Sequence, residues 1–158
     1  MNNLIFFSAV ILPWLLIGAL GVWLALAKDK IKTGRQILSA LGLAIVTWFI
    51  ASLFKYNFPS PRPFEVVPDF EPLFITGHGD AFPSGHAAFF GALALALFWQ
   101  NRLVGLGFLI GAILVSVARI LAGVHWPGDV LAGFGTAILV VSLIFLIKKK
   151  LISGHFGL

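Results

Sequence analysis

Residues 103–121 read LVGLGFLIGAILVSVARIL, an apolar run whose single charged residue, Arg119, stands close to its end. An α-helix needs about 20 residues of this kind to cross roughly 30 Å of hydrocarbon. The run is too long for a buried strand, and the edges of an open sheet cannot face lipid. Gly107 and Gly111 stand four residues apart, a spacing that lets a second helix approach closely. The run therefore predicts a packed transmembrane helix.

The rest of the chain has the same character. Apolar residues make up 59% of its 158 positions and charged residues only 11%, whereas ordinary soluble domains contain roughly 25% charged residues. The absence of cysteine excludes a disulfide framework, a thiolate metal site and a cysteine nucleophile. We expect an all-α, polytopic transmembrane bundle that forms a single domain over residues 1–158. Its five predicted spans are residues 4–27, 36–54, 86–100, 103–121 and 129–147.

The basic residues predict the orientation of this bundle. Most of them fall between the first and second spans, between the third and fourth, or after the fifth, and an odd number of spans puts these regions on one side. That side is expected to be the cytoplasm, with the N-terminus outside the plasma membrane and the C-terminus inside. The basic residues on this side are Lys28, Lys30, Lys32, Arg35, Arg102, Lys148, Lys149 and Lys150.

Lys55, Arg62 and Arg119 are left at the outer side. Taken alone, Lys55 and Arg62 are typical of membrane anchors, a snorkelling lysine and a loop arginine. Their place on a side otherwise poor in positive charge favours a binding role instead. A compact ammonium group and a planar guanidinium group together suit a phosphoryl group with its three oxygens.

The segment Pro83-Ser84-Gly85-His86 opens the third span. Ser84 can cap the helix and Gly85 lets a ligand approach the main chain, so free amides and the positive helix end would face an anion. Such a helix entry alone is more often only a capping device. His86 favours a functional interpretation, because an imidazole at that depth is costly to keep for packing alone.

Arg119, His125 and Asp129 form the third cluster. The four-residue offset places His125 and Asp129 on one helical face if the turn continues through Pro127. The carboxylate can then accept from one ring nitrogen and leave the other free to attack a substrate. An interfacial ion pair with a satisfied histidine is the alternative, although ionisable residues at this depth are functional candidates by default.

These clusters, in this order, resemble the motif of the type 2 phosphatidic acid phosphatase family, over residues 55–129. The three parts of that motif are Lys-x6-Arg-Pro, Pro-Ser-Gly-His and Ser-Arg-x5-His-x3-Asp. Ala118 departs from it, since it stands where the family usually has serine. The five predicted spans also differ from the six of many bacterial members, which leaves open a homo-oligomer that completes the lipid-facing wall.

The resemblance implies a lipid phosphatase that needs neither a metal nor a cofactor, and no group of metal ligands stands out in the sequence. It makes His125 the nucleophile that forms a phosphohistidine, Asp129 its orienting base and His86 the general acid. The phosphate cradle it implies, whose positive charge stabilises the transition state, consists of Lys55, Arg62, Ser84, Gly85 and Arg119.

A site at the outer ends of membrane helices suits an amphiphile whose phosphate lies at the headgroup level while its chains stay in lipid. Within the family, we prefer by analogy polyprenyl pyrophosphate, such as undecaprenyl pyrophosphate of the cell envelope. Phosphatidylglycerol phosphate, phosphatidic acid and a phosphorylated saccharolipid remain alternatives. A lipid-to-lipid phosphotransferase and a non-catalytic binding or transport protein for anionic lipids also stay open. No nucleic-acid-binding module is visible.

Overall fold

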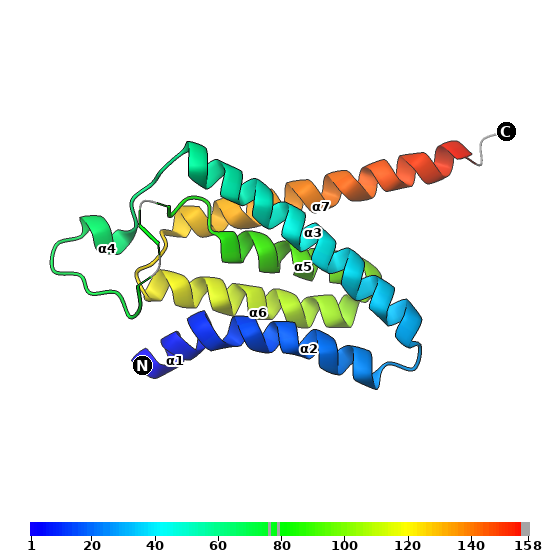
Figure 1. The fold of residues 1–158 in the computed structure, drawn as a ribbon, viewed down its shortest axis with the longest axis horizontal. Coiled ribbons are helices and arrows are strands. Elements are labelled where there is room, and N and C mark those ends of the chain that lie inside the picture. Colours follow the sequence, from blue (N-terminus) through cyan, green and yellow to red (C-terminus); the bar gives the residue numbers. More distant parts are fainter. Residues whose placement is uncertain (76, 79, 156–158) are drawn as a thin grey trace.

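The structure, a computed structural model, describes residues 1–75, 77–78 and 80–155. This part of the chain forms a bundle of long helices with an irregular loop at one end (Figure 1). The N-terminal helix consists of α1 (Asn2–Phe6), a π-helical turn η1 (Phe7–Ile11) and α2 (Leu12–Leu26) in direct succession. The elements that follow are α3 (Lys30–Asn57), α4 (Pro63–Val66), α5 (Gly85–Gln100), α6 (Arg102–Leu121) and α7 (Pro127–His155).

All five predicted spans are helices, so the predicted all-α bundle is confirmed. Four helical segments are long and apolar enough to cross a membrane, while α5 is a shorter apolar helix. The largest differences from the predicted boundaries are the start of α3 and the end of α7. Helix α3 starts at Lys30 because Asp29 caps it. The side chain of Asp29 accepts from the backbone N–H of Lys32 at 2.9 Å. The last helix runs on to His155, since the lysines after residue 147 favour helix.

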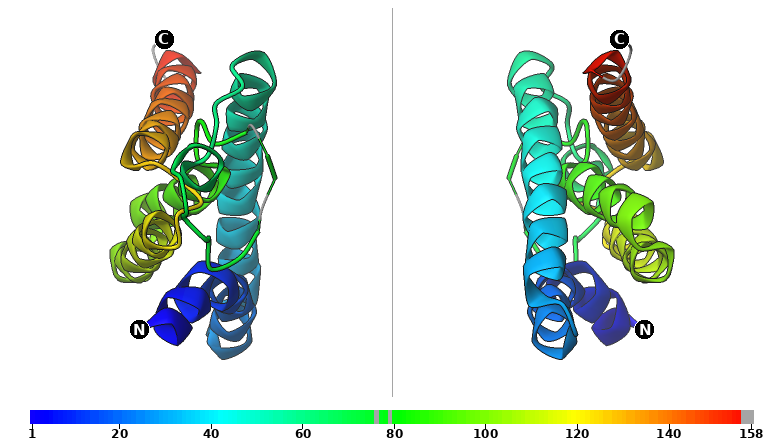
Figure 2. Two further views of the ribbon diagram at one scale, coloured as in Figure 1. Left: turned by 90° about the vertical axis from the view of Figure 1, so that its left-hand side faces the viewer. Right: turned by 90° about the vertical axis from the view of Figure 1, so that its right-hand side faces the viewer.

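The short helix α5 lies at the centre of the bundle, packed against α3, α6 and α7 (Figure 2). Its alanines and glycines let neighbouring backbones come close, which is how helices associate where lipid provides no hydrophobic driving force. The fully buried residues of α5 are Ala87, Ala88, Ala92, Leu93, Ala96 and Leu97.

Different segments of the chain meet at the two ends of the bundle (Figure 1). The chain start, the end of α3, the long loop, the start of α5 and the α6–α7 turn share one end. The α2–α3 and α5–α6 turns and the last turns of α7 lie at the other end, which carries the basic clusters. The grouping of basic residues at one end agrees with the predicted arrangement, while the side that faces the cytoplasm stays a prediction.

The contact between α5 and α7 depends on Gly133. A Cβ atom at Gly133 would lie 2.6 Å from the carbonyl oxygen of Ser84 and 2.8 Å from the Cβ of Ala87, but one at Gly135 would meet nothing within 4 Å. We expect Gly133→Ala to lower the free energy of unfolding by about 1–3 kcal/mol, because the two backbones must separate. The matched Gly135→Ala should leave it unchanged or raise it. Unfolding in detergent measures both, and equal stabilities would contradict the close approach.

Candidate active site

Two hydrogen bonds join the segments that carry the predicted site. The backbone N–H of Ser84, just before α5, donates to the carbonyl oxygen of Asp129 in the first turn of α7 at 2.8 Å. The side chain of Arg62, in the long loop, donates through Nη1 to the carbonyl oxygen of Val124 at 2.8 Å. The starts of α5 and α7, the α6–α7 turn and the long loop therefore meet at one end of the bundle.

His125 and Asp129 form a buried pair. Nδ1 of His125 lies 3.3 Å from Oδ2 of Asp129, and the residues are 2% and 3% exposed. The same oxygen accepts from the backbone N–H of Trp126 at 2.7 Å, so the carboxylate is held in place from a second direction. Because an ionised carboxylate only accepts, the shared proton belongs on Nδ1. Nε2 then keeps its lone pair for a ligand.

The environment of His125 favours the neutral imidazole. Burial lowers the pKa of His125 to about 4, because a charged ring would lose its water, and the hydrogen bond to Asp129 opposes this only in part. The positive charges of Arg119, Arg62 and Lys55 lower the pKa further. At neutral pH the ring is therefore uncharged, which is the state a nucleophile requires.

Arg62 and Lys55 are both held by Asp80, a residue that was not predicted to belong to the site. Oδ1 of Asp80 accepts from Nε and Nη2 of Arg62 at 3.0 and 2.7 Å, and the backbone oxygen of Asp80 accepts from Nζ of Lys55. Arg62 is only 3% exposed. No spacing rule points to Asp80, since the loop alone brings it to its partners.

Arg119 is a buried cation with spare hydrogen-bonding capacity. It is 5% exposed, and its Nε finds no hydrogen-bond partner within the described residues. Its guanidinium carbon stands 5.7 Å from the ring centroid of Phe74. An unsatisfied buried donor costs about 1–3 kcal/mol, so an anion bound here would be favoured.

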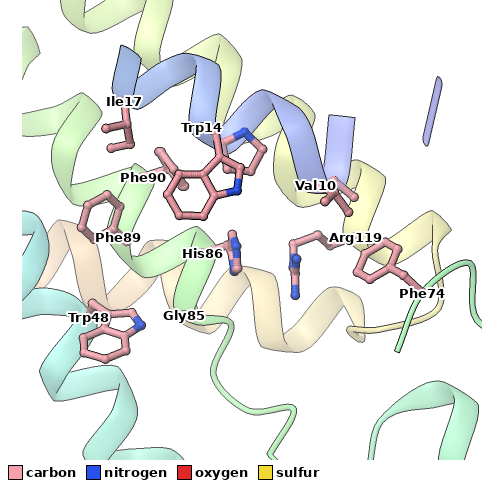
Figure 3. Close-up of a pocket in the computed structure, with 12 residues that line it drawn as sticks. Val10, Trp14, Ile17, Trp48, Phe74, Gly85, His86, Phe89, Phe90 and Arg119 are labelled. Atoms are coloured by element: carbon pink, nitrogen blue, oxygen red, sulfur yellow. The ribbon is translucent and has the colours of Figure 1, made fainter. Parts of the chain in front are cut away.

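His86 and Arg119 lie beside each other in the wall of a cavity of about 510 Å³ (Figure 3). The volume falls within the range of about 300–1,000 Å³ that small-molecule sites occupy. Trp14 of the N-terminal helix projects over this cavity, and the remaining wall is apolar. The N-terminal helix was not predicted to contribute to the site, because its apolar residues look alike whether they face lipid or a cavity. Further lining residues are Val10, Ile17, Trp48, Phe74, Phe89 and Phe90.

The long loop is fastened to the turn that carries His125. Gly123 has a φ of 74°, and a Cβ atom there would lie 2.0 Å from the ring of Phe70, so only glycine fits. The indole N–H of Trp126 donates to the carbonyl oxygen of Pro61 at 3.1 Å. These contacts place the loop that bears Arg62 against the α6–α7 turn.

Within the described residues, no group of three or more His, Asp or Glu side chains is arranged to hold a metal ion. The positive charge of the site comes instead from Lys55, Arg62 and Arg119, and from the amide end of α5. Ser84 and Gly85 form that end, where Oγ of Ser84 accepts from the backbone N–H of Ala87 at 3.5 Å. The serine hydroxyl keeps its own proton to donate.

The family model of the PAP2 superfamily matches residues 35–153. Bacitracin transport permease protein BcrC of Bacillus licheniformis is 25% identical over 155 residues, which cover 98% of this chain and 75% of that protein. Undecaprenyl-diphosphatase of Sulfolobus acidocaldarius is 35% identical over 123 residues, which cover 77% of this chain. The chain spans only 56% of the length of that archaeal relative.

Two solved structures share the fold. LpxE of Aquifex aeolicus superimposes with a TM-score of 0.63 and 27% identity, covering 89% of this chain and 80% of that one. A transmembrane PAP2 type phosphatidylglycerolphosphate phosphatase from Bacillus subtilis gives a TM-score of 0.62 with 22% identity. That superposition covers 95% of this chain and 75% of the other, and shows the likeness of the fold alone.

The depressed pKa of His125 predicts its behaviour on acidification. We expect the imidazole to stay neutral down to about pH 5 and to take up its proton near pH 4. In the unfolded chain, histidine is protonated below about pH 6.5, so the free energy of unfolding should fall as the pH drops from 6.5 towards 4. NMR of ¹⁵N-labelled histidines, with His125→Gln to assign the signal, measures this titration. Protonation near pH 6.5 would contradict the burial of the ring.

Proposed function

The chain belongs to the PAP2 superfamily. We propose that it is a phosphatase that hydrolyses a lipid phosphate or pyrophosphate at the membrane surface. The buried pair of His125 and Asp129 carries the proposal, because it supplies an oriented, neutral nucleophile among Lys55, Arg62 and Arg119. Three cations around one imidazole favour a site for an anionic substrate. A purely structural pair of His125 and Asp129 would not require them.

In the proposed reaction, Nε2 of His125 attacks the phosphorus atom while the bond from phosphorus to the leaving oxygen breaks. His86 delivers a proton to that oxygen, and the dephosphorylated lipid departs. Asp129 accepts a hydrogen bond from the N–H group at Nδ1, which stays on the ring. Its negative charge stabilises the positive ring of the phosphohistidine. Water then attacks the phosphorus while His86 takes up one of its protons, the bond to Nε2 breaks, and inorganic phosphate leaves with both histidines restored.

The charge of the transferring group spreads over its equatorial oxygens. Lys55, Arg62 and Arg119 face it with fixed positive charge, and the Ser84 hydroxyl and the Gly85 amide donate at the start of α5. First-turn amides have no partner inside their helix, so they are available to an anion. The catalytic charge therefore comes from the chain itself, and we propose that hydrolysis needs no metal.

The cavity beside His86 and Arg119 fits the part of a lipid chain nearest its phosphate, with the remaining chain in the bilayer. Polyprenyl pyrophosphate remains our preferred substrate, because the archaeal relative carries the name undecaprenyl-diphosphatase. The basic residues at the opposite end of the bundle favour a site on the outer face of the plasma membrane. A phosphotransferase would form the same phosphohistidine and pass the group to a second lipid.

The two histidines provide the direct test. We expect His125→Ala and His86→Ala to reduce the turnover of lipid phosphates by about 10²–10⁴-fold, with excess chelator present throughout. Wild-type protein quenched during turnover of ³²P-labelled substrate should carry acid-labile phosphohistidine that His125→Ala lacks. The loop variant His78→Ala serves as the control and should keep its activity. Full turnover in His125→Ala would overturn its role as the nucleophile, and no turnover in the wild type would favour the binding-protein alternative. Labelled acceptor lipid without free phosphate would favour the transferase.

Arg119→Lys tests the phosphate cradle. Lysine keeps the charge but loses the planar fork of donors, so we expect kcat/KM to fall by about 10²-fold, as for the loss of one transition-state donor. The measurement compares initial rates of phosphate release in detergent, with the melting temperature recorded for the same sample. Near-normal turnover would remove Arg119 from the cradle.

A further inference from the structure

Asp80 lies between two cations of the cradle and contacts each of them with a different part of the residue. Its side chain accepts from Arg62 and its backbone oxygen accepts from Nζ of Lys55. Its chain neighbour Ala81 donates to the carbonyl oxygen of Ser60 at 3.0 Å. The short segment around Asp80 is thus attached to the loop that leads into Arg62, and its carboxylate position is set by the backbone.

The contacts of Arg62 leave part of the guanidinium group free. Of the five N–H donors of an arginine, two go to Oδ1 of Asp80 and one to the carbonyl oxygen of Val124. Among the described residues, the other two donors have no recorded partner and remain for an anion. Because two acceptors hold the group from different sides, it cannot turn about its own axis.

Charge reinforces this arrangement. Burial raises the pKa of Asp80, but the hydrogen bond and charge of Arg62, with the charge of Lys55, outweigh it and lower the pKa overall. The carboxylate is therefore ionised at neutral pH. Its side chain is 42% exposed, whereas that of Arg62 is 4% exposed, so the acid lies at the rim and the cation inside.

We propose that Asp80 is a positioning residue, which aims the two remaining donors of Arg62 at the phosphate without touching the substrate itself. The proposal rests on the proposed function, in which Arg62 is a phosphate ligand. It differs from a competing role in which the carboxylate occupies the phosphate position and must be displaced. The two roles predict opposite effects on phosphate affinity when the charge of Asp80 is removed.

A double-mutant cycle separates positioning from a merely structural role. We expect Asp80→Ala to lower kcat/KM by about 10- to 100-fold, the size of effect that misplacing a catalytic group produces. In an Arg62→Ala background the same change should cost less than about 3-fold, because Asp80 acts through Arg62. A full, additive loss in that background, or unchanged activity in the single variant, would overturn the proposal.

Asp80→Asn keeps the shape of the side chain and one acceptor, so it guards against misfolding and should give an intermediate loss. Glu71→Gln is the matched control, since it removes one exposed negative charge from the same loop. We expect its activity to be unchanged. A loss as large as that of Asp80→Asn would assign the effect to general electrostatics and overturn the proposal.

Calorimetric titration with inorganic phosphate tests the same inference without turnover. Asp80→Ala and Asp80→Asn should bind phosphate more weakly than the wild type, and tighter binding would establish the competing role instead. A wild type that binds phosphate more tightly than both Asp80 variants and yet hydrolyses no lipid phosphate would overturn the proposed function and leave the role of Asp80 intact. If the wild type hydrolyses lipid phosphates and the Asp80 variants bind phosphate as tightly as it does, the proposed function stands and the positioning role of Asp80 is overturned.

Discussion

The burial of two arginines at one end of the helix bundle is the constraint around which the site is built. Arg62 and Arg119 both lose water there and repel each other, a combination that is costly unless anions compensate it. Asp80 and a carbonyl oxygen compensate Arg62, but Nε of Arg119 has no partner among the described residues. Within the described residues, the site thus has a surplus of positive charge and of hydrogen-bond donors, which a bound phosphate would compensate.

A rigid frame keeps this surplus in place. The small residues of α5 let α3, α6 and α7 pack closely around it, so the start of α5 cannot move without disturbing three neighbours. Its bond to the first turn of α7 ties the serine cap to the helix that bears Asp129. Phe70 closes over Gly123, where no larger residue fits, and holds the loop on the other side. Preorganisation of this kind is what electrostatic catalysis requires.

The sequence predicted much of this architecture, for identifiable reasons. Helical spans follow from long apolar runs, and the spacing of His125 and Asp129 corresponds to one helical turn. Both features depend only on residues that are close in the sequence, so both could be predicted. Asp80 was not predictable, because its contact with Arg62 crosses a loop whose path no periodicity encodes. The contribution of Trp14 to the cavity wall was not predicted for another reason. Apolar side chains that face lipid and those that face a cavity follow the same sequence pattern.

The length of α5 bears on how a substrate meets the protein. Its 16 residues extend about 24 Å, several ångströms less than the roughly 30 Å of a typical hydrocarbon layer. With its far end at one interface, its serine-capped start would lie beneath the opposite headgroup plane unless the bilayer thins locally to meet it. Hydrophobic mismatch would then lower the work of drawing a phosphate inward, so membrane thickness becomes a determinant of turnover.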